Sequence, residues 1–315
     1  MPVLSGQAPA KVNLALNVLD RRADGYHELR TIFQTISLAD RLRVSYTNRG
    51  AAKTILHCTD PSLAGPGNLA ARAAGDLLQA GGWRGGVEVT IEKRIPVGAG
   101  LGGGSSDAAA VLRALALLLK PAPPADMLFE VAASLGSDVP YFLVGGSAVG
   151  IGRGEEVYPL PEGPAQWLVL LVPDVRVSTA EAYRELGRRK RRLTAARLRH
   201  IINGFCSGVS VSRGCGTQTL PEARLSCFHN DFEEVVFRRY PKLEPWKNVL
   251  LQRGASCAMM SGSGSALFGV FPDRRQALRA RAAIDAFPGK VYLARTLNRR
   301  SYRGLWRLQP HRRKK

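Results

Sequence analysis

A chain of 315 residues with 45% hydrophobic and 22% charged side chains is long enough for two globular domains, each with a buried core. It contains no run of about 18 apolar residues, which excludes an ordinary membrane-spanning helix, and its first residues lack the basic and apolar regions of a signal peptide. The net charge of +20 excludes an acidic protein and favours polyanionic partners such as nucleotides, nucleic acids or acidic lipids.

The first predicted strand covers residues 11–19, where every second residue is apolar and faces a core. Lys11 and Asn13 therefore share the opposite face of the strand. Side chains two residues apart on one face are neighbours, so Lys11 and Asn13 can contact one ligand together. A solvated strand face is the other interpretation of these two residues.

An Asp-Gly turn lies within residues 20–25, and a strand is expected from there to residue 38. Tyr26 and His27 directly follow the turn. This pair is either ordinary packing or an aromatic platform with a polar group that reads the edge of a ligand. Further predicted elements are strands at 41–46 and 53–58 and a helix at 68–79 that two glycines terminate.

Residues 95–108 combine a glycine loop with the start of a helix, after an alternating strand at residues 87–92. Five of the seven residues from 98 to 104 are glycines, which let backbone N–H groups approach a bound anion. Residues 105–107, two serines and an aspartate, are expected to cap a helix rich in alanine and leucine. Free N–H groups and the helix dipole both favour an anion at such a helix start, so we interpret the loop as a phosphate-binding cradle.

Two other interpretations of the loop fit less well. A flexible connection would not need a strand before it and a cap after it. A dinucleotide-binding fold matches the spacing of Gly98, Gly100 and Gly103, but it requires an acidic residue about 20 positions later, after a second strand. That place holds Pro121, Pro123, Pro124 and Asp126 with no strand before them, and no Lys-Ser or Lys-Thr follows a glycine at the spacing of the common P-loop.

After the prolines at 121–124, a helix is expected at 126–135. Asp138 then lies in an apolar setting, where a buried acid needs a partner or a function. A hairpin at 147–151 and 156–160 closes the first domain, with the boundary near residues 161–164. The second domain is predicted as a helix-covered antiparallel sheet of the ferredoxin-like type, with strands at 167–172, on both sides of a turn at 261–265 and at 291–296, and helices at 179–189, 231–240, 244–252 and 274–286.

Residues 203–222 show no period and are interpreted as a loop or a poorly ordered insert. Five cysteines, an odd number without a C-x-x-C pair, are expected to be reduced thiols rather than a disulfide framework or a metal site, which suits a cytoplasmic protein. Basic residues gather at 188–199 and 299–315. The sequence thus predicts an α+β fold with domains at 1–162 and 163–298 and a disordered basic tail at 299–315.

Three separated motifs occur in one order: APAKVN at residues 8–13, the glycine loop with its serines at 96–106, and SGSG at 261–264. Together they resemble the GHMP small-molecule kinases, from about residue 8 to 297. DGYHE at 24–28, GSDVP at 136–140 and NDFE at 230–233 are similar to the GHMP branch that phosphorylates a cytidine diphosphate-linked methylerythritol in the non-mevalonate route to isoprenoids. The resemblance implies a ribosomal-protein-type N-terminal domain, a ferredoxin-like C-terminal domain, and ATP and Mg²⁺ as cofactors.

The resemblance also implies roles for single residues. Asp138 matches a catalytic base that takes the proton of the substrate hydroxyl. Lys11 matches a basic partner that keeps this carboxylate ionised and balances the charge of the transferring phosphoryl group. Tyr26 and Tyr183 would stack on the two faces of the cytosine, and His27 would read the edge of the base.

The remaining site residues are implied in the same way. Asn13, Thr179, Gly262 and Ser263 would bind the substrate, and the SGSG turn would close near the phosphates. Ser105 or Ser106 would neighbour Mg²⁺. The implied ATP-binding residues are Asn68, Leu69, Lys93, Pro96, Val97, Gly98, Ala99, Gly100, Leu101, Gly102, Gly103, Gly104, Ser105 and Ser106.

Two other functions stay open at this point. A GHMP kinase of the homoserine or mevalonate type is one, although its substrate has no base for Tyr26 and His27 to hold. A nucleic-acid-binding protein that uses the basic surface is the other, and the complete set of catalytic residue types argues against it. We expect a small-molecule substrate with a cytidine diphosphate group, no membrane partner and no specific nucleic acid, and the sequence leaves the oligomeric state open.

Overall fold

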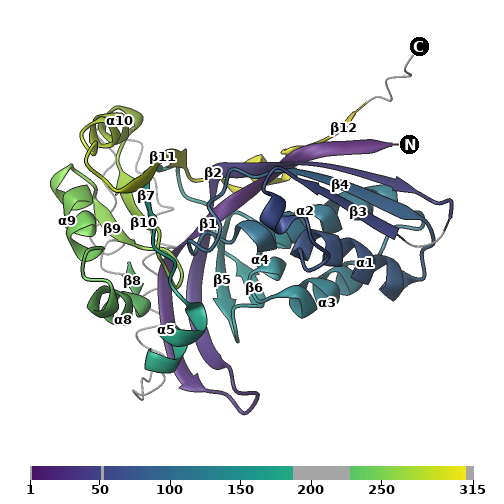
Figure 1. The fold of residues 1–315 in the computed structure, drawn as a ribbon, viewed down its shortest axis with the longest axis horizontal. Coiled ribbons are helices and arrows are strands. Elements are labelled where there is room, and N and C mark those ends of the chain that lie inside the picture. Colours follow the sequence, from purple (N-terminus) through teal and green to yellow (C-terminus); the bar gives the residue numbers. More distant parts are fainter. Residues whose placement is uncertain (1, 51–52, 187–227, 310–315) are drawn as a thin grey trace.

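The structure, a computed structural model, describes residues 2–50, 53–186 and 228–309. Strands β1 (Val3–Arg21) and β2 (His27–Thr47) form a long antiparallel pair between two groups of helices (Figure 1). Both strands are longer than predicted, since β1 begins well before residue 11 and β2 is continuous where two strands were expected. Shifts in pairing register, one of them between Pro9 and Lys11, accompany the bending of this pair.

Within the described residues, β1 and β2 belong to an eight-stranded sheet with the path β12–β1–β2–β4–β3, to which β5, β6 and β8 are added. The other strands are β3 (Lys53–Cys58), β4 (Gly86–Glu92), β5 (Ser147–Ile151), β6 (Glu156–Pro159), β8 (His229–Asn230) and β12 (Trp306–Gln309).

Four helices cover one face of this sheet (Figure 1). They are α1 (Leu69–Gly81), α2 (Gly103–Leu118), α3 (Ala125–Leu135) and α4 (Val139–Val144), and a short 3₁₀ helix at Pro61–Leu63 precedes them. Four alanines of α2 are fully buried in the core beneath the sheet, namely Ala108, Ala109, Ala110 and Ala114. Helix α4 was not predicted, because six residues are too few for a helical period to show in the sequence.

The second sheet is antiparallel, with the order β11–β7–β10–β9, as the sequence predicted for a ferredoxin-like half. Its strands are β7 (Trp167–Pro173), β9 (Cys257–Met260), β10 (Leu267–Phe271) and β11 (Gly289–Arg295). Its helices are α8 (Phe232–Arg239), α9 (Glu244–Gln252) and α10 (Arg274–Ala282), which share an apolar core with β7 and β10, and α5 (Thr179–Leu186), which packs on α8. No helix of the described residues is both long and apolar enough to cross a bilayer.

The two sheets are joined by a common apolar cluster. Val12 and Ile36 of the central pair are fully buried together with Leu168 and Phe268 of the second sheet. The two halves therefore share a continuous apolar core, and the polar residues of β1 face away from this core. Cys58 is a free thiol and Cys257 is buried in the second sheet, whereas residues 203–222 and the other three cysteines lie outside the described residues.

The expectation of a disordered tail is wrong for residues 299–309. Helix α11 (Arg299–Arg303) and strand β12 return to the first sheet, where β12 pairs with the first residues of β1. Buried Tyr302 and half-buried Trp306 explain this, because Trp306 packs over Gly6, where a Cβ would lie 2.4 Å from the indole ring. The many basic residues of this segment led to the prediction of disorder, although Tyr302 and Trp306 anchor it to the first half. Residues 310–315 lie outside the described residues.

Candidate active site

A cleft of about 870 Å³ is lined by residues from both halves of the chain. It brings together many of the residues that the sequence predicted for the site. These are Lys11, Asn13, Tyr26, His27, Gly98, Gly100, Gly102, Ser105, Asp138, Thr179, Tyr183, Gly262 and Ser263. The other predicted residues do not line it, namely Asn68, Leu69, Lys93, Pro96, Val97, Ala99, Leu101, Gly103, Gly104 and Ser106.

The glycine loop forms one wall of the cleft. Gly98, Gly100 and Gly102 have φ angles of +70°, +77° and +70°, which favour glycine. A Cβ on Gly100 would lie 2.2 Å from the carbonyl oxygen of Ser261, and one on Gly102 would lie 3.1 Å from Cγ of Lys11. The loop thus needs glycine both for its backbone conformation and for its close contact with the neighbouring segments.

Helix α2 begins at Gly103, directly after the loop, and no side chain caps its N-terminus. The expectation that residues 105–107 form the cap is wrong, because two of these side chains have other partners. The Ser106 hydroxyl donates to the carbonyl oxygen of Pro9 at 2.6 Å, and Asp107 accepts from Lys93 at 2.7 Å. The uncapped N-terminus has backbone N–H groups that suit a phosphate.

Lys11 and Asp138 form the polar centre of the cleft. The Lys11 side chain is 4% exposed, and its ammonium lies 3.3 Å from Oδ2 of Asp138, whose side chain is 32% exposed. The same ammonium donates to Oδ1 of Asn13 at 2.6 Å, and the Asn13 amide donates to Thr31 at 2.7 Å. Asp138 precedes α4 but does not cap it, so its carboxylate is left to face Lys11 and the cleft.

The SGSG turn closes the cleft from the second half of the chain. The Ser261 hydroxyl donates to the carbonyl oxygen of Gly100 at 3.0 Å, so the turn is tied to the glycine loop. Buried Asn230 donates to the carbonyl oxygen of Gly262 at 2.8 Å, and Ser263 and Thr179 share a hydrogen bond of 2.7 Å. Sequence reasoning gave Asn230 no role, although a buried amide between polar neighbours is a signal of such bonding.

The aromatic residues of the cleft are arranged differently from the predicted pair of tyrosines. Tyr183 stacks on His27, with ring centroids 5.7 Å apart and an interplanar angle of 16°, and its ring meets Phe232 edge-on. Tyr26 is 56% exposed, and the Arg153 guanidinium lies 4.9 Å from its ring centroid. Burial, together with the charge of Asp138, raises the pKa of Tyr183, which therefore stays a neutral phenol.

Sequence reasoning also missed three arginines in the cleft. Arg21, Arg153 and Arg184 line it beside the aromatic residues and give this side a positive charge. They are scattered among many other basic residues of a strongly basic chain, so their positions carried no separate signal.

Three predicted ATP-binding side chains have structural partners. The Lys93 side chain is 8% exposed, and its ammonium is bound by Asp40 and Asp107. The Asn68 carboxamide caps α1 by accepting from the N–H of Ala70 at 2.8 Å. Leu69 begins α1 and packs against the core of the first half.

The two serines expected beside Mg²⁺ differ in whether their hydroxyl groups are free to face the cleft. The Ser106 hydroxyl is buried against Pro9, whereas Ser105 lines the cleft. Of the two, Ser105 fits a magnesium ion that is carried by phosphate oxygens.

Comparison with known proteins places these features in a family. Residues 68–146 match the family model for the N-terminal domain of GHMP kinases, and residues 217–290 match the model for their C-terminal part. A 4-diphosphocytidyl-2-C-methyl-D-erythritol kinase of Solibacter usitatus is 49% identical over 302 residues, which cover 96% of this chain and 91% of the relative. The kinase of the same name from Geobacter sulfurreducens is 41% identical, with 91% of this chain and 96% of the relative covered.

Solved structures agree with these relatives. A crystal structure of 4-(cytidine 5'-diphospho)-2C-methyl-D-erythritol kinase superposes with a TM-score of 0.74 at 40% identity and covers 93% of this chain and 98% of that chain. A mevalonate kinase structure superposes with a TM-score of 0.65 at 14% identity, covering 94% of this chain and 99% of that chain, which shows a shared fold.

Proposed function

Since this chain belongs to the 4-diphosphocytidyl-2-C-methyl-D-erythritol kinase family of GHMP kinases, we propose that it uses ATP to phosphorylate the 2-hydroxyl of 4-diphosphocytidyl-2-C-methyl-D-erythritol. The products are the 2-phosphate and ADP, in the non-mevalonate route to isoprenoids. The expected GHMP resemblance and the α+β two-domain fold are confirmed by the family matches.

The observation that carries the proposal is the pair of Lys11 and Asp138 beside the glycine loop. The substrate hydroxyl gives its proton to the Asp138 carboxylate, its oxygen forms the new bond to the γ-phosphorus, and the bond between that phosphorus and ADP breaks. Lys11 lies 3.3 Å from Asp138 and supplies positive charge to the transferring group. Its burial and its bond to Asn13 hold the ammonium in one place.

The phosphates of ATP lie along the glycine loop and the start of α2. Gly98, Gly100 and Gly102 line the cleft, and the uncapped backbone of α2 follows them. Backbone N–H groups and the helix dipole at this point favour the negative charge of phosphates. A magnesium ion bound to ATP would supply further charge neutralisation, and the Ser105 hydroxyl, which lines the cleft, would lie beside it.

The aromatic side of the cleft suits a cytidine diphosphate. Nδ1 of His27 lies 3.0 Å from the carbonyl oxygen of Leu19, which only accepts, so Nδ1 carries the proton. In the neutral ring Nε2 is then an acceptor, which matches the exocyclic amino group of cytosine and not the carbonyl group of uracil. Tyr26 and Tyr183 line the same part of the cleft, and the 56% exposed ring of Tyr26 suits stacking on the base.

The charges of this side of the cleft fit the diphosphate of the same substrate. Arg21, Arg153 and Arg184 line the cleft beside the aromatic residues. Guanidinium groups pair well with phosphates. Homoserine and mevalonate carry neither a base nor a phosphate, so they would leave these groups unused.

The test is ATP consumption by the purified chain with the cytidine-linked substrate, homoserine and mevalonate in parallel. We expect turnover with the first alone, and turnover with either of the others at a similar rate would contradict the proposal. A filter-binding measurement with RNA over a range of salt concentrations tests the nucleic-acid alternative. If the affinity for RNA falls steeply with salt concentration and does not depend on the base sequence, the binding is charge attraction alone.

A further inference from the structure

Helix α4 connects the catalytic base to a buried support at the back of the cleft. Asp138 directly precedes the helix, and Gly145 and Gly146 follow it. The helix has six residues and is therefore only about 9 Å long. Such a short rigid element transmits a movement at its C-terminal end to the carboxylate at its start.

Tyr302 of α11 holds the C-terminal end of α4. Its hydroxyl donates to the carbonyl oxygen of Phe142 at 2.5 Å, and its side chain is 1% exposed. The last carbonyl groups of a helix have no partner within the helix, so this hydroxyl satisfies a group that would otherwise be buried without one. Burial raises the pKa of Tyr302, which keeps it a neutral donor.

The ring of Tyr302 also fits the chain directly after α4. A Cβ on Gly145 would lie 2.2 Å from this ring, and the φ angle of Gly145 is +68°, so glycine is required there. The guanidinium of Arg113 lies 4.5 Å from the centroid of the same ring. Arg113 belongs to α2, so Tyr302 touches both the helix that follows the phosphate loop and the helix that follows Asp138.

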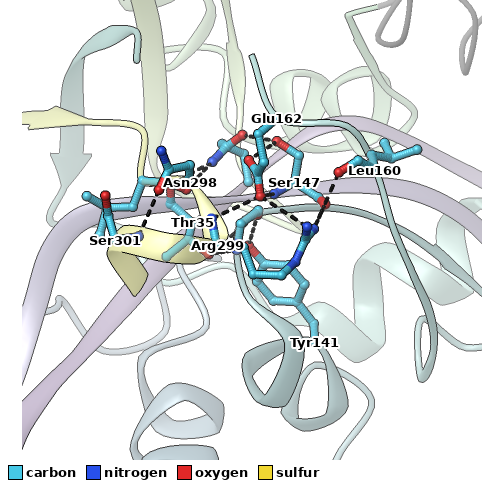
Figure 2. A network of polar contacts seen from close by, with 11 residues as sticks. Thr35, Tyr141, Ser147, Leu160, Glu162, Asn298, Arg299 and Ser301 are labelled. Carbon is cyan, nitrogen blue, oxygen red and sulfur yellow. Dashed lines mark hydrogen bonds and ion pairs between the residues drawn. The ribbon is translucent and has the colours of Figure 1, made fainter. Parts of the chain in front are cut away.

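A polar network next to this contact fixes the same end of α4 (Figure 2). The Tyr141 hydroxyl donates to the carbonyl oxygen of Gly146 at 2.8 Å and lies 2.6 Å from the Thr35 hydroxyl. The backbone N–H of Arg299 donates to Glu162 at 2.9 Å, and its guanidinium donates to the carbonyl oxygen of Ser147 at 2.7 Å. The C-terminal segment is thereby locked to both the sheet and the connection between the two halves.

We propose that Tyr302 is a positioning residue for phosphoryl transfer, which holds Asp138 against Lys11 through α4 without touching either substrate. The proposal rests on the proposed role of Asp138 as the base. A catalytic group displaced by about 1 Å can cost on the order of 100-fold in rate. Loss of one hydrogen bond at the far end of α4 loosens the base and does not remove it, so we expect a smaller loss.

The experiment compares Tyr302→Phe with Tyr46→Phe. Each variant removes one hydrogen bond from a tyrosine hydroxyl to a backbone carbonyl, because the Tyr46 hydroxyl donates to Arg84 at 2.6 Å outside the cleft. We expect kcat of Tyr302→Phe to fall about tenfold with KM for both substrates within about twofold, and Tyr46→Phe to keep the wild-type values. Unchanged kcat in folded Tyr302→Phe would overturn the proposal.

A second background separates positioning from general destabilisation. In Asp138→Asn protein, Tyr302→Phe should cause no further loss of kcat, because the group that it positions is gone. An equal loss in both backgrounds would overturn the proposal. If Tyr302→Phe does not fold, Arg113→Gln, which removes the guanidinium that lies 4.5 Å from the centroid of the Tyr302 ring, replaces it in the same comparison.

Hydrogen exchange gives a readout that does not depend on the reaction. Backbone amides of residues 139–146 should exchange faster in Tyr302→Phe than in Tyr46→Phe. Equal exchange in the two variants would overturn the support by Tyr302 even if the wild-type chain did not phosphorylate the cytidine-linked substrate. Absence of wild-type turnover would instead overturn the proposed function, so the two failures are distinguishable.

Discussion

The ammonium of Lys11 and the carboxylate of Asp138 lie 3.3 Å apart, and the two groups differ strongly in exposure. Lys11 is buried and bonded to Asn13, whereas about a third of Asp138 is open to the cleft. A hydroxyl group of a ligand can therefore reach Asp138 but not displace Lys11. This asymmetry supports the proposal that the carboxylate takes the proton and the amine balances the charge.

The first prediction concerns this carboxylate. Asp138→Asn keeps the shape of the side chain but cannot take a proton, so we expect kcat to fall by roughly 10²–10⁴-fold. Binding of ATP, measured by calorimetry, should be mostly retained. Asp126→Asn on the exposed face of α3 is the matched control and should leave kcat unchanged. Near-normal turnover of Asp138→Asn would remove Asp138 from the reaction.

The second prediction concerns the phosphate cradle. Gly102→Val places a branched side chain close to the ring of Phe142 and to Lys11, at a φ angle of +70°. Gly82→Val is its control, because Gly82 has a φ angle of +67° but no atom within 4 Å of its Cβ position. Both variants carry backbone strain of about 1–2 kcal/mol, so both should be less stable.

The two glycine variants should differ in ATP binding alone. We expect the affinity of Gly102→Val for ATP to drop more than about tenfold, because the added side chain presses on Phe142 and Lys11 and shifts the loop that would bind the phosphates. Gly82→Val should bind ATP as the wild-type chain does. Equal affinities in the two folded variants would show that the loop is only a connection.

The alternation along β1 was enough to predict that Lys11 and Asn13 share a face, because a strand period is a local property. The glycine loop was equally visible from its composition. The partners of Lys93 were not, since Asp40 and Asp107 reach it from two other elements and only tertiary structure brings them together. The fold of α11 depended in the same way on burial of Tyr302 against α4.

Tyr183 illustrates the limit of reasoning from a resemblance. Its place in the cleft was predicted, but its stacking on His27 was not. Helix α5 and the turn after β1 are remote in sequence, and their contact depends on how the second half docks on the central strands. A sequence motif thus predicts which residue lies in the site and what chemistry it offers, whereas tertiary packing determines which side chain it contacts.

The third prediction concerns pH and the buried carboxylate of Asp107. Burial and the neighbouring carboxylate of Asp40 raise the pKa of Asp107 well above its ordinary value. The folded protein then binds this proton more tightly than the unfolded one. The resulting stability is full below the unfolded pKa of about 4 and is lost as pH rises through the folded pKa.

Asp107→Asn keeps an oxygen for Lys93 but removes this titration. Relative to the wild-type chain, its free energy of unfolding in urea should increase as the pH rises from about 4 upward. Asp273→Asn is a control of opposite sign, because the N–H of Gln276 lowers the pKa of Asp273, and its stability relative to wild type should fall with rising pH. A difference between Asp107→Asn and wild type that is independent of pH would contradict the raised pKa.

The fourth prediction concerns His27 and the identity of the base. His27→Ala removes the acceptor Nε2 and the ring on which Tyr183 stacks, while the exposed ring of Tyr26 stays available. Discrimination between the cytidine-linked substrate and its uridine analogue, measured as the ratio of the two kcat/KM values, should therefore decrease. An unchanged ratio would mean that another group reads the edge of the base.

The last prediction concerns stacking by Tyr26. If its ring covers a face of the cytosine, Tyr26→Ala should weaken substrate binding by about 1–3 kcal/mol, the scale of base–aromatic stacking, and Tyr26→Phe should be mild. Tyr158→Ala is a close control, because Tyr158 is 54% exposed, Tyr26 is 56% exposed, and Tyr158 does not line the cleft. Dissociation constants for ATP and for the cytidine-linked substrate, measured on the same folded protein, decide the question. A loss confined to the cytidine-linked substrate supports stacking, whereas a parallel loss for both ligands would make Tyr26 a packing residue.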